Sequence, residues 1–427
     1  MDVKKAYFIG IGGIGMSALA QYMKDRGTDV SGSDREASPV TELLGSKGVP
    51  VIIGQKAENV PQNADLVVYS EAVWEDNPER ERAKELGARQ ISYFEALGEA
   101  TEGKRAIAVA GTHGKTTTTG MIAKILADAG AKPYAIVGSI VQDFGSNYLK
   151  GDSDIFVVEA CEYKRDFLSL APHVLVITNI EWDHTDYYKD LADLQSAFRT
   201  LMEKVPADGA IVTDAKHPNI APILQGFQTR TIDHTVESAY DLRLPGEFNR
   251  NNARAAAAAA RFLLPDIAED SIATSLSHFH GTWRRFEYKG KTKKGADVYD
   301  DYAHHPTAIR ATLAELKKKP HGKIYVAFHP HLYSRTRDLL PEFAAAFADA
   351  DGVFIAPIYP AREIDDGTIS SAMLAERISK NGTPAEALTF DEIQSAFETY
   401  PKAGDIIMTM GAGDIYKVAD SLVETGT

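Results

Sequence analysis

The stretch Gly111–Thr119, which reads GTHGKTTTT, constrains the fold more than any other part of the chain. An apolar run at 106–110 precedes it and is typical of a buried strand, and residues 120–130 have the spacing of an amphipathic helix. A glycine-rich turn between a strand and a helix directs backbone N–H groups toward an anion. Lys115 adds a positive charge, and Thr116 adds a hydroxyl that can ligate Mg²⁺. We therefore predict a phosphate-binding loop in an α/β fold.

This loop is a shortened form of the standard phosphate-binding motif, which has a glycine five residues before the glycine of its Gly-Lys pair. Val109 occupies that position here. The alternative is a glycine-rich turn whose threonines cap a helix without a catalytic role. A lysine between a glycine and four hydroxyl side chains favours phosphate binding. The residues that we predict to hold the phosphates of a nucleotide are Gly111, Thr112, Gly114, Lys115, Thr116 and Thr117.

The overall composition limits the class of protein. With 427 residues, the chain has room for two or three domains with substantial cores. The net charge of −14 argues against a general nucleic-acid-binding protein, so an anionic substrate requires local basic pockets. The single cysteine, Cys161, excludes an intrachain disulfide and a cysteine-rich zinc site, which fits a reducing cytosol.

The hydropathy pattern predicts a soluble, cytoplasmic protein. Glycines at positions 10, 12, 13 and 15 interrupt the apolar segment that a signal peptide needs, and no small-residue cleavage site follows. No run reaches the roughly eighteen apolar residues that span a membrane. We therefore expect neither a membrane nor nucleic acid among the partners, and monomer and homodimer both remain open.

The first residues predict a second site for phosphate groups. Residues 5–9 are typical of a strand, the run Gly10–Gly15 satisfies G-x-G-x-x-G, and residues 16–26 suit a helix. Asp34 follows Gly15 by nineteen residues, where a dinucleotide-binding fold holds a ribose hydroxyl. Alone, this pattern indicates an NAD-dependent oxidoreductase, but a single G-x-G-x-x-G is weak evidence. We predict a site for a nucleotide or nucleotide-sugar diphosphate at the start of the helix.

Two further strands deliver polar residues to the same region of the central segment. The apolar run 155–158 leads to Glu159, and the run 174–177 leads into a segment that contains His184. Because ligands of parallel sheets bind at the carboxyl ends of the strands, we expect Lys115, Glu159 and His184 to converge. Thr116, Glu159 and His184 then suit a Mg²⁺ ion that bridges phosphates. The alternative to a metal site is that Glu159 is a surface acid at the end of a strand and His184 is a histidine in a loop.

Residues 246–260 are rich in alanine and predict a helix. Asn249 and Asn252 lie one turn apart on it and can present amides to an adenine or a phosphate. The alternative is that these asparagines cap the helix.

The last third of the chain predicts another α/β domain, with polar clusters after its strands. The predicted strands are 323–328, 352–358 and 405–410. The clusters are 300–306, 329–336 and 411–414. The four histidines and two acids of the first two clusters raise the alternative of a zinc hydrolase, but their spacing is not that of a metal-binding helix.

Together these motifs resemble those of the Mur ligase family, and the resemblance covers nearly all 427 residues. The motifs that carry it are GIGGIGMSALA at 10–20, AGTHGKTTTT at 110–119, EACE at 159–162, TNIEWDH at 178–184, GTWRRFE at 281–287, DDYAHHP at 300–306, HPHLYSRT at 329–336 and GAGDIY at 411–416. Several such motifs in the family's order are far more specific than any one of them.

The resemblance implies a ligase that joins L-alanine to the carboxylate of UDP-N-acetylmuramate, with ATP and Mg²⁺, in peptidoglycan precursor synthesis. The carboxylate would take the γ-phosphoryl group to give an acyl phosphate, which the amine would then attack. The implied fold has three α/β domains that close around the substrates. These are an N-terminal Rossmann-like domain for the UDP-sugar at 1–103, a central P-loop-type ATPase domain with a mainly parallel sheet at 104–281, and a C-terminal Rossmann-like domain at 282–427.

The resemblance also implies roles for individual residues. Lys115, His113, Glu159 and His184 would be catalytic, with His113 where the sugar carboxylate meets the γ-phosphate. Arg285 and Asp301 would contact ATP, with Asn249 and Asn252 near the base. The uridine nucleotide would lie along Gly12, Gly13, Ile14, Gly15 and Asp34, with Ser70 and Asn77 nearby. The alanine pocket would contain Tyr302, His304 and Arg335.

The chain departs from the family pattern at several positions. Leu332 replaces an arginine that is expected to help hold the amino-acid carboxylate, so either Arg335 holds it alone or the amino acid differs. Phe248 replaces a usual histidine, and Cys161 replaces a usual aspartate. The region around 198–199 lacks the lysine that sibling ligases carbamylate, so we predict no carbamylated lysine.

Three other functions remain as alternatives. A sibling ligase attaches a murein tripeptide to the same sugar nucleotide, and Leu332 leaves that choice of acceptor open. An NAD-dependent oxidoreductase would leave the phosphate loop unexplained. A non-catalytic nucleotide-binding regulator would not need Lys115, Glu159 and His184 together.

Overall fold

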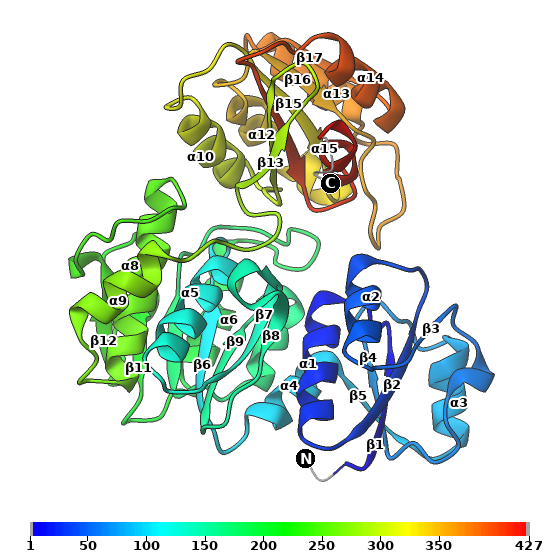
Figure 1. Cartoon of the computed structure of the whole chain (residues 1–427), viewed down its shortest axis with the longest axis vertical. Helices are drawn as coiled ribbons and strands as arrows, with labels where there is room; N and C mark the ends of the chain where they lie inside the picture. Colours follow the sequence, from blue (N-terminus) through cyan, green and yellow to red (C-terminus); the bar gives the residue numbers. More distant parts are fainter. Residues whose placement is uncertain (1–2, 424–427) are drawn as a thin grey trace. The chain divides into compact units, whose positions relative to one another are not determined.

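The computed structural model describes residues 3–423, which form an α/β protein with three separate sheets (Figure 1). The chain divides into two compact units. The first unit holds the residues up to Glu181, together with Ala192–Arg243 and Asn249–Thr282. The second holds Trp182–Leu191, Leu244–Phe248 and the residues from Trp283 onward. None of the helices within the described range combines the length and the apolar character that crossing a membrane requires.

The amino-terminal sheet has five parallel strands in the order β3-β2-β1-β4-β5. Its strands are β1 (Lys5–Ile9), β2 (Asp29–Asp34), β3 (Val51–Ile53), β4 (Leu66–Tyr69) and β5 (Arg89–Ser92). The helices are α1 (Ile14–Asp25), α2 (Pro39–Ser46), the short η1 (Ala57–Asn59), α3 (Pro78–Glu85) and α4 (Tyr93–Thr101). In the central strand β1, the four residues from Ala6 to Ile9 are fully buried, which explains their apolar run.

The second sheet has seven strands in the order β12-β11-β10-β6-β9-β7-β8, and only β8 runs antiparallel to its neighbour. Its strands are β6 (Arg105–Ala110), β7 (Tyr134–Val141), β8 (Ser146–Leu149), β9 (Ile155–Glu159), β10 (Val174–Ile177), β11 (Ala210–Thr213) and β12 (Arg230–Asp233). The accompanying helices are α5 (Lys115–Asp128), η2 (Gln142–Phe144), η3 (Tyr163–Ser169), α6 (Leu191–Met202), α7 (Ala221–Leu224), η4 (His234–Val236), α8 (Glu247–Leu263) and α9 (Glu269–Ser277).

Helix α5 begins five residues earlier than the apolar pattern predicts, at Lys115 instead of Gly120. The reason is Gly114, whose backbone φ of 82° turns the chain directly into the helix. Thr116 to Thr119 therefore form the first turn of the helix, and all four are buried. The loop proper is shorter than its sequence indicates.

The third sheet has six strands in the order β13-β14-β18-β15-β16-β17, with β13 antiparallel to β14. Its strands are β13 (Glu287–Lys291), β14 (Asp297–Asp301), β15 (Ile324–His329), β16 (Gly352–Ile355), β17 (Ala385–Ala387) and β18 (Ile406–Gly411). The helices are α10 (Pro306–Leu316), α11 (Tyr333–Asp338), α12 (Leu340–Ala346), α13 (Ser371–Lys380), α14 (Phe390–Thr399) and α15 (Tyr416–Leu422). Two apolar cores form around this sheet. The strand predicted at 352–358 ends at Ile355.

Candidate active site

The phosphate loop connects β6 to α5 and depends on two glycines. Gly111 has a φ of 132° and Gly114 a φ of 82°, conformations that L side chains rarely adopt. A Cβ atom on Gly111 would collide with the hydroxyl of Thr178, and one on Gly114 would collide with the amide oxygen of Asn252. Both positions therefore need glycine for the backbone and for the space around it.

The end of β10, which pairs with β6, supports this loop. Asn179 accepts a hydrogen bond from the backbone N–H of His113 at 2.9 Å and donates one to the carbonyl of His113 at 3.0 Å. Thr178 donates to the same carbonyl. The sequence pointed to neither residue as a support, although both directly follow a strand that neighbours β6.

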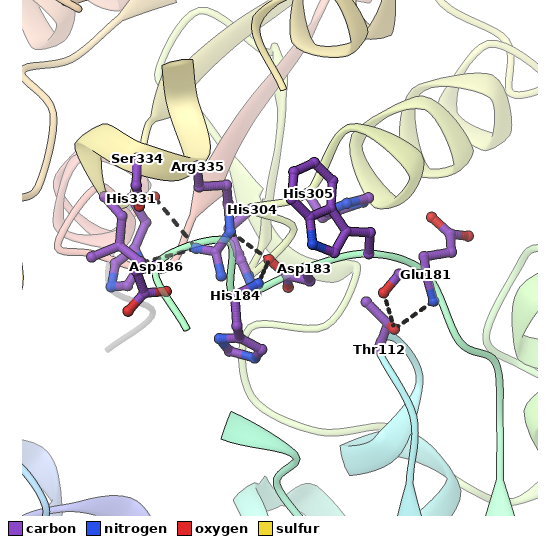
Figure 2. Close-up of polar contacts among 12 residues, drawn as sticks. Thr112, Glu181, Asp183, His184, Asp186, His304, His305, His331, Ser334 and Arg335 are labelled. Carbon is purple, nitrogen blue, oxygen red and sulfur yellow. Dashed lines mark hydrogen bonds and ion pairs between the residues drawn. The ribbon is translucent and has the colours of Figure 1, made fainter. Parts of the chain in front are cut away.

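Thr112 ties the loop to Glu181 through two hydrogen bonds (Figure 2). The Thr112 hydroxyl accepts from the Glu181 N–H at 2.9 Å and donates to the Glu181 carbonyl at 3.0 Å. The carboxylate of Glu181 lies 3.6 Å from the Nε2 atom of His113. His113 is therefore in the loop as predicted, beside an acid that sequence reasoning missed.

Lys115 is held at the loop by a buried acid. Its ammonium donates to the carbonyl of Thr112 at 3.2 Å and forms an ion pair with Glu162 at 2.9 Å. Burial is the largest single effect and lowers the pKa of Lys115, but the neighbouring acidic groups, Glu162 first among them, together raise the pKa above its ordinary value. Lys115 is thus charged, as a phosphate ligand must be. Glu162 was not among the predicted site residues, although the motif EACE contains it.

Thr116 and Glu159 come together as predicted. The Thr116 hydroxyl donates to the Oε1 atom of Glu159 at 3.0 Å, and the N–H of Gly138 donates to its Oε2 atom at 2.8 Å. A side chain on Gly138 would collide with this carboxylate. The pair offers the hard oxygen ligands that suit Mg²⁺. His184, the third predicted ligand, belongs to the other compact unit, so its approach to Glu159 stays a prediction.

Asn249 and Asn252 lie inside helix α8, so the proposal that they cap it is wrong. Both are buried, and the Asn252 amide lies 3.4 Å from the Oδ1 atom of Asn249. Asn252 also lies against Gly114. This asparagine therefore borders the phosphate loop, while the predicted contact of either residue with an adenine remains a prediction.

The carboxylate of Asp34 supports the amino-terminal glycine turn through a hydrogen bond. The N–H of Gly12 donates to the Asp34 carboxylate at 2.8 Å, and Gly13 caps helix α1 without a side-chain acceptor. Ile14 and Gly15 are the first two residues of that helix.

The two residues predicted near the uridine have structural contacts of their own. Ser70 lies beside Gly10 at the end of β4. Asn77 caps helix α3 through the N–H of Glu79 at 2.9 Å, and its amide donates to Gln55 at 2.9 Å. Their contacts with a nucleotide remain predictions.

The second compact unit contains a buried ion pair, which Figure 2 shows. The Nε atom of Arg335 donates to Asp183 at 2.7 Å, and the two side chains are 2% and 3% exposed. The Nη1 atom of Arg335 donates to the Nδ1 atom of His331 at 3.0 Å. Asp183 was missed in the sequence, although it stands directly before the predicted His184.

The predicted alanine-pocket residues lie around this pair. His304 is 5.4 Å from Tyr302 and 6.3 Å from His331, measured between ring centroids. The Nδ1 atom of His304 donates to the Tyr302 carbonyl at 3.0 Å, which leaves a lone pair on Nε2 when the ring is neutral. The structure therefore brings Tyr302, His304 and Arg335 into one cluster.

The charges of this cluster are set mainly by burial and by Arg335. Burial opposes ionisation of Asp183, but Arg335 holds the pKa of this carboxyl well below its ordinary value. Burial and the nearby guanidinium lower the pKa of His331 to about 3 and hold that of His304 well below its ordinary value. Both histidines are neutral at pH 7.

Strained backbone occurs in some of the polar motifs. Of the eight non-glycine residues with positive φ in the described range, four lie within motifs that carry the family resemblance and four lie outside them. Those within the motifs are His184 (53°), Arg284 (61°), Phe286 (49°) and Leu332 (72°). Such angles persist where the surroundings enforce them, and they concentrate at functional sites. Leu332 is also fully buried, so an apolar side chain fills the position where we expected an arginine.

Arg285 and Asp301 also lie in the second unit. Asp301 is buried at the end of β14, where it accepts from the hydroxyl of Thr312 at 2.9 Å and the N–H of Ala303 at 3.0 Å. Burial raises the pKa of Asp301 to about 6, although the charge of Arg285 opposes this rise. The Arg285 guanidinium lies 4.7 Å from the centre of the Tyr302 ring. The contacts of both residues with ATP remain predictions.

Comparison with known proteins identifies the family. Residues 5–105 match the Mur ligase family catalytic domain, residues 109–240 the Mur ligase middle domain, and residues 284–413 the Mur ligase glutamate ligase domain. A UDP-N-acetylmuramate–L-alanine ligase of Clostridium kluyveri is 40% identical over 98% of this chain and 97% of its own length.

Solved structures agree with this match. The crystal structure of the UDP-N-acetylmuramate-alanine ligase MurC from Thermotoga maritima has a TM-score of 0.79 and 29% identity, over 98% of both chains. A murein peptide ligase from Psychrobacter arcticus has a TM-score of 0.75 and 25% identity, over 99% of this chain and 100% of that one. The protein belongs to the Mur ligase family.

Proposed function

We propose that this protein is an ATP-dependent ligase that joins L-alanine to the carboxylate of UDP-N-acetylmuramate during peptidoglycan precursor synthesis. The observation that carries the proposal is the phosphate loop, where a charged Lys115 lies beside the oxygen pair of Thr116 and Glu159. The 40% identity to L-alanine ligases over nearly the whole chain supports the choice of substrates. It also argues against an oxidoreductase built on the glycine turn.

In the first step, the loop binds the phosphates of ATP and the sugar carboxylate attacks the γ-phosphorus. Lys115 leaves Glu162 for the β- and γ-phosphates and stabilises the charge that develops during transfer. Thr116, Glu159 and His184 would hold Mg²⁺, which neutralises phosphate charge. His113 faces the carboxylate from within the loop. The products of this step are an acyl phosphate and ADP.

In the second step, the amine of L-alanine attacks the acyl phosphate and displaces phosphate. The amine must first lose a proton, and the neutral His304 offers the lone pair of Nε2 to take it. The Nη2 atom of Arg335 has no hydrogen-bond partner within residues 3–423, so it can receive the alanine carboxylate. Arg285 and Asp301 bind ATP from the same compact unit.

The sugar nucleotide binds along the amino-terminal glycine turn. The N–H groups at the start of α1 receive its diphosphate, because no side chain caps them and the first turn has no acid. We propose that domains 1–103, 104–281 and 282–427 carry the sugar-nucleotide, ATP and amino-acid sites. We also propose that the protein works in the cytoplasm as a monomer or homodimer.

The proposal is tested by measuring phosphate release with UDP-N-acetylmuramate, ATP and Mg²⁺ across single amino acids and a murein tripeptide. We expect release with L-alanine and none when the sugar nucleotide is omitted. Release with the tripeptide but not with L-alanine would select the sibling activity. The similarity to a murein peptide ligase and the presence of Leu332 are the reasons for testing this alternative. No release with any acceptor would disprove the ligase function.

A further inference from the structure

Tyr93 packs against the glycine turn at its last glycine. A Cβ atom on Gly15 would lie 2.5 Å from both the Cζ and the Oη atoms of Tyr93, so the ring would have to shift. The phenol hydroxyl therefore reaches the first turn of α1. Ser92 and Glu95 form a capping box at the start of α4, where Tyr93 is the first residue, so the backbone that carries this ring is well fixed.

The hydroxyl of Tyr93 is free to donate to a ligand. Within residues 3–423 it has no hydrogen-bond partner, and the side chain is only half-buried. Burial and the negative charge of Glu159 raise the pKa of Tyr93 above its ordinary value, so the group keeps its proton.

A buried polar network fixes the first turn of α1 against the second sheet. Asn147 on β8 donates to the carbonyl of Ile14 and to the hydroxyl of Ser17, the latter at 2.8 Å. Gln21 donates to Asn147 at 3.1 Å. Asn147 and Ser17 are fully buried, so breaking their hydrogen bonds would leave buried polar groups without a partner, at a cost in free energy. The glycine turn, Tyr93 and Glu159 all belong to the same compact unit.

We propose that Tyr93 is a substrate-binding residue whose hydroxyl donates a hydrogen bond to the diphosphate of the sugar nucleotide. This inference rests on the proposed function, because it takes the UDP-sugar as the ligand of the glycine turn. The hydroxyl is a neutral donor, so it can bind a phosphate oxygen without bringing a charge that needs a partner when the ligand is absent. Gly15 is then required by the tyrosine that covers it.

The test is binding of UDP and of UDP-N-acetylmuramate to Tyr93→Phe, measured by calorimetry without ATP or amino acid. We expect about tenfold weaker binding of both ligands, because a hydrogen bond to a charged group is lost while the ring stays in place. In steady-state assays, KM for the sugar nucleotide should rise by the same factor, while KM for ATP and for L-alanine stays within about twofold.

Tyr400→Phe is the matched control, since it removes an exposed hydroxyl outside the site and should change nothing. Equal affinity of Tyr93→Phe and wild type for both ligands, with an unchanged melting temperature, would reduce Tyr93 to a packing residue. If Tyr93→Phe weakens the binding of UDP-N-acetylmuramate but not that of UDP, the hydroxyl contacts the sugar, and the diphosphate assignment is disproved. Because the binding assay contains no acceptor, it remains decisive even if L-alanine is not the amino acid used.

Discussion

The phosphate loop and the Asp183–Arg335 cluster both pair a cation with a buried acid, but they differ in what that pairing allows. Lys115 reaches Glu162 through a flexible stem and also contacts backbone carbonyls, and its side chain is 14% exposed. Arg335 is 2% exposed and held by Asp183 and His331 at once. Lys115 can exchange its partner for a phosphate, whereas Arg335 keeps its partner and offers only its remaining nitrogen.

This difference separates two uses of charge in one enzyme. A charge that must follow a moving phosphoryl group needs a partner it can leave, which a lysine ammonium permits. A charge that must hold a small amino acid in place is better fixed in advance, because ordering it costs nothing when the substrate binds. The same contrast predicts that mutations in the two places affect different quantities.

The largest effect should follow from Lys115→Ala, which removes the exchangeable charge. We expect turnover to fall by about 10³-fold, because stabilisation of the transferring phosphoryl group is lost. The melting temperature should also fall, since the substitution leaves the buried Glu162 carboxylate without its partner, so turnover is measured well below that temperature. Lys318→Ala removes an exposed lysine just after helix α10 and is the control. Near-normal turnover of Lys115→Ala would contradict the role of the loop.

An intermediate effect, mainly on stability, should follow from Arg335→Met. It leaves Asp183 buried without its partner, which we expect to lower the free energy of unfolding by about 3–5 kcal/mol. Arg105→Met breaks the exposed pair with Asp154 and should cost less than about 1 kcal/mol. Urea denaturation of both variants measures the difference. Equal losses would show that the Asp183–Arg335 pair does not stabilise the fold as described.

The double variant Asp183→Asn/Arg335→Met sharpens this test. It removes both buried charges, so it should be more stable than Arg335→Met alone. Turnover should stay low, because the nitrogen that we propose to receive the amino-acid carboxylate is still missing. A double variant that regains turnover would exclude Arg335 from substrate binding.

The smallest effect concerns Cys161, which lies between the two acids beside the phosphate loop. Burial, and then the charge of Glu162, raise the pKa of this thiol to about 12. Since only the thiolate reacts, alkylation of the folded protein at pH 8.5 should be at least about 100-fold slower than that of the urea-unfolded protein. Mass spectrometry after timed iodoacetamide treatment measures both rates. Similar rates would mean that this side of the loop is open to solvent.

The sequence predicted the local parts of the site well, because each depends on neighbouring residues. A buried strand, glycines and a lysine before a helix are enough to place β6, the loop and α5. The same reasoning placed Glu159 at the carboxyl end of β9 and Asp301 at the end of β14. Parallel strands bring such ends to one edge whatever the rest of the chain does.

The supporting residues could not be predicted, because they depend on contacts between distant segments. Arg335 meets Asp183 from 152 residues away. Gly138 meets Glu159 only because β7 neighbours β9, an order that no local pattern indicates. Tyr93 and Gly15 likewise come together through the packing of α4 on α1. Strand order and helix packing decide these contacts, and both arise from the whole fold.

The network around Asn147 also bears on inhibitor design. Because it ties the glycine turn to the second sheet, it helps to set the separation between the phosphate loop and the diphosphate site that we propose at the glycine turn. A single compound that joins a diphosphate mimic to a group for the phosphate loop would therefore face two anchoring points at a constant distance. A rigid linker of that length would convert the second binding event into an intramolecular one and gain affinity that neither half has alone.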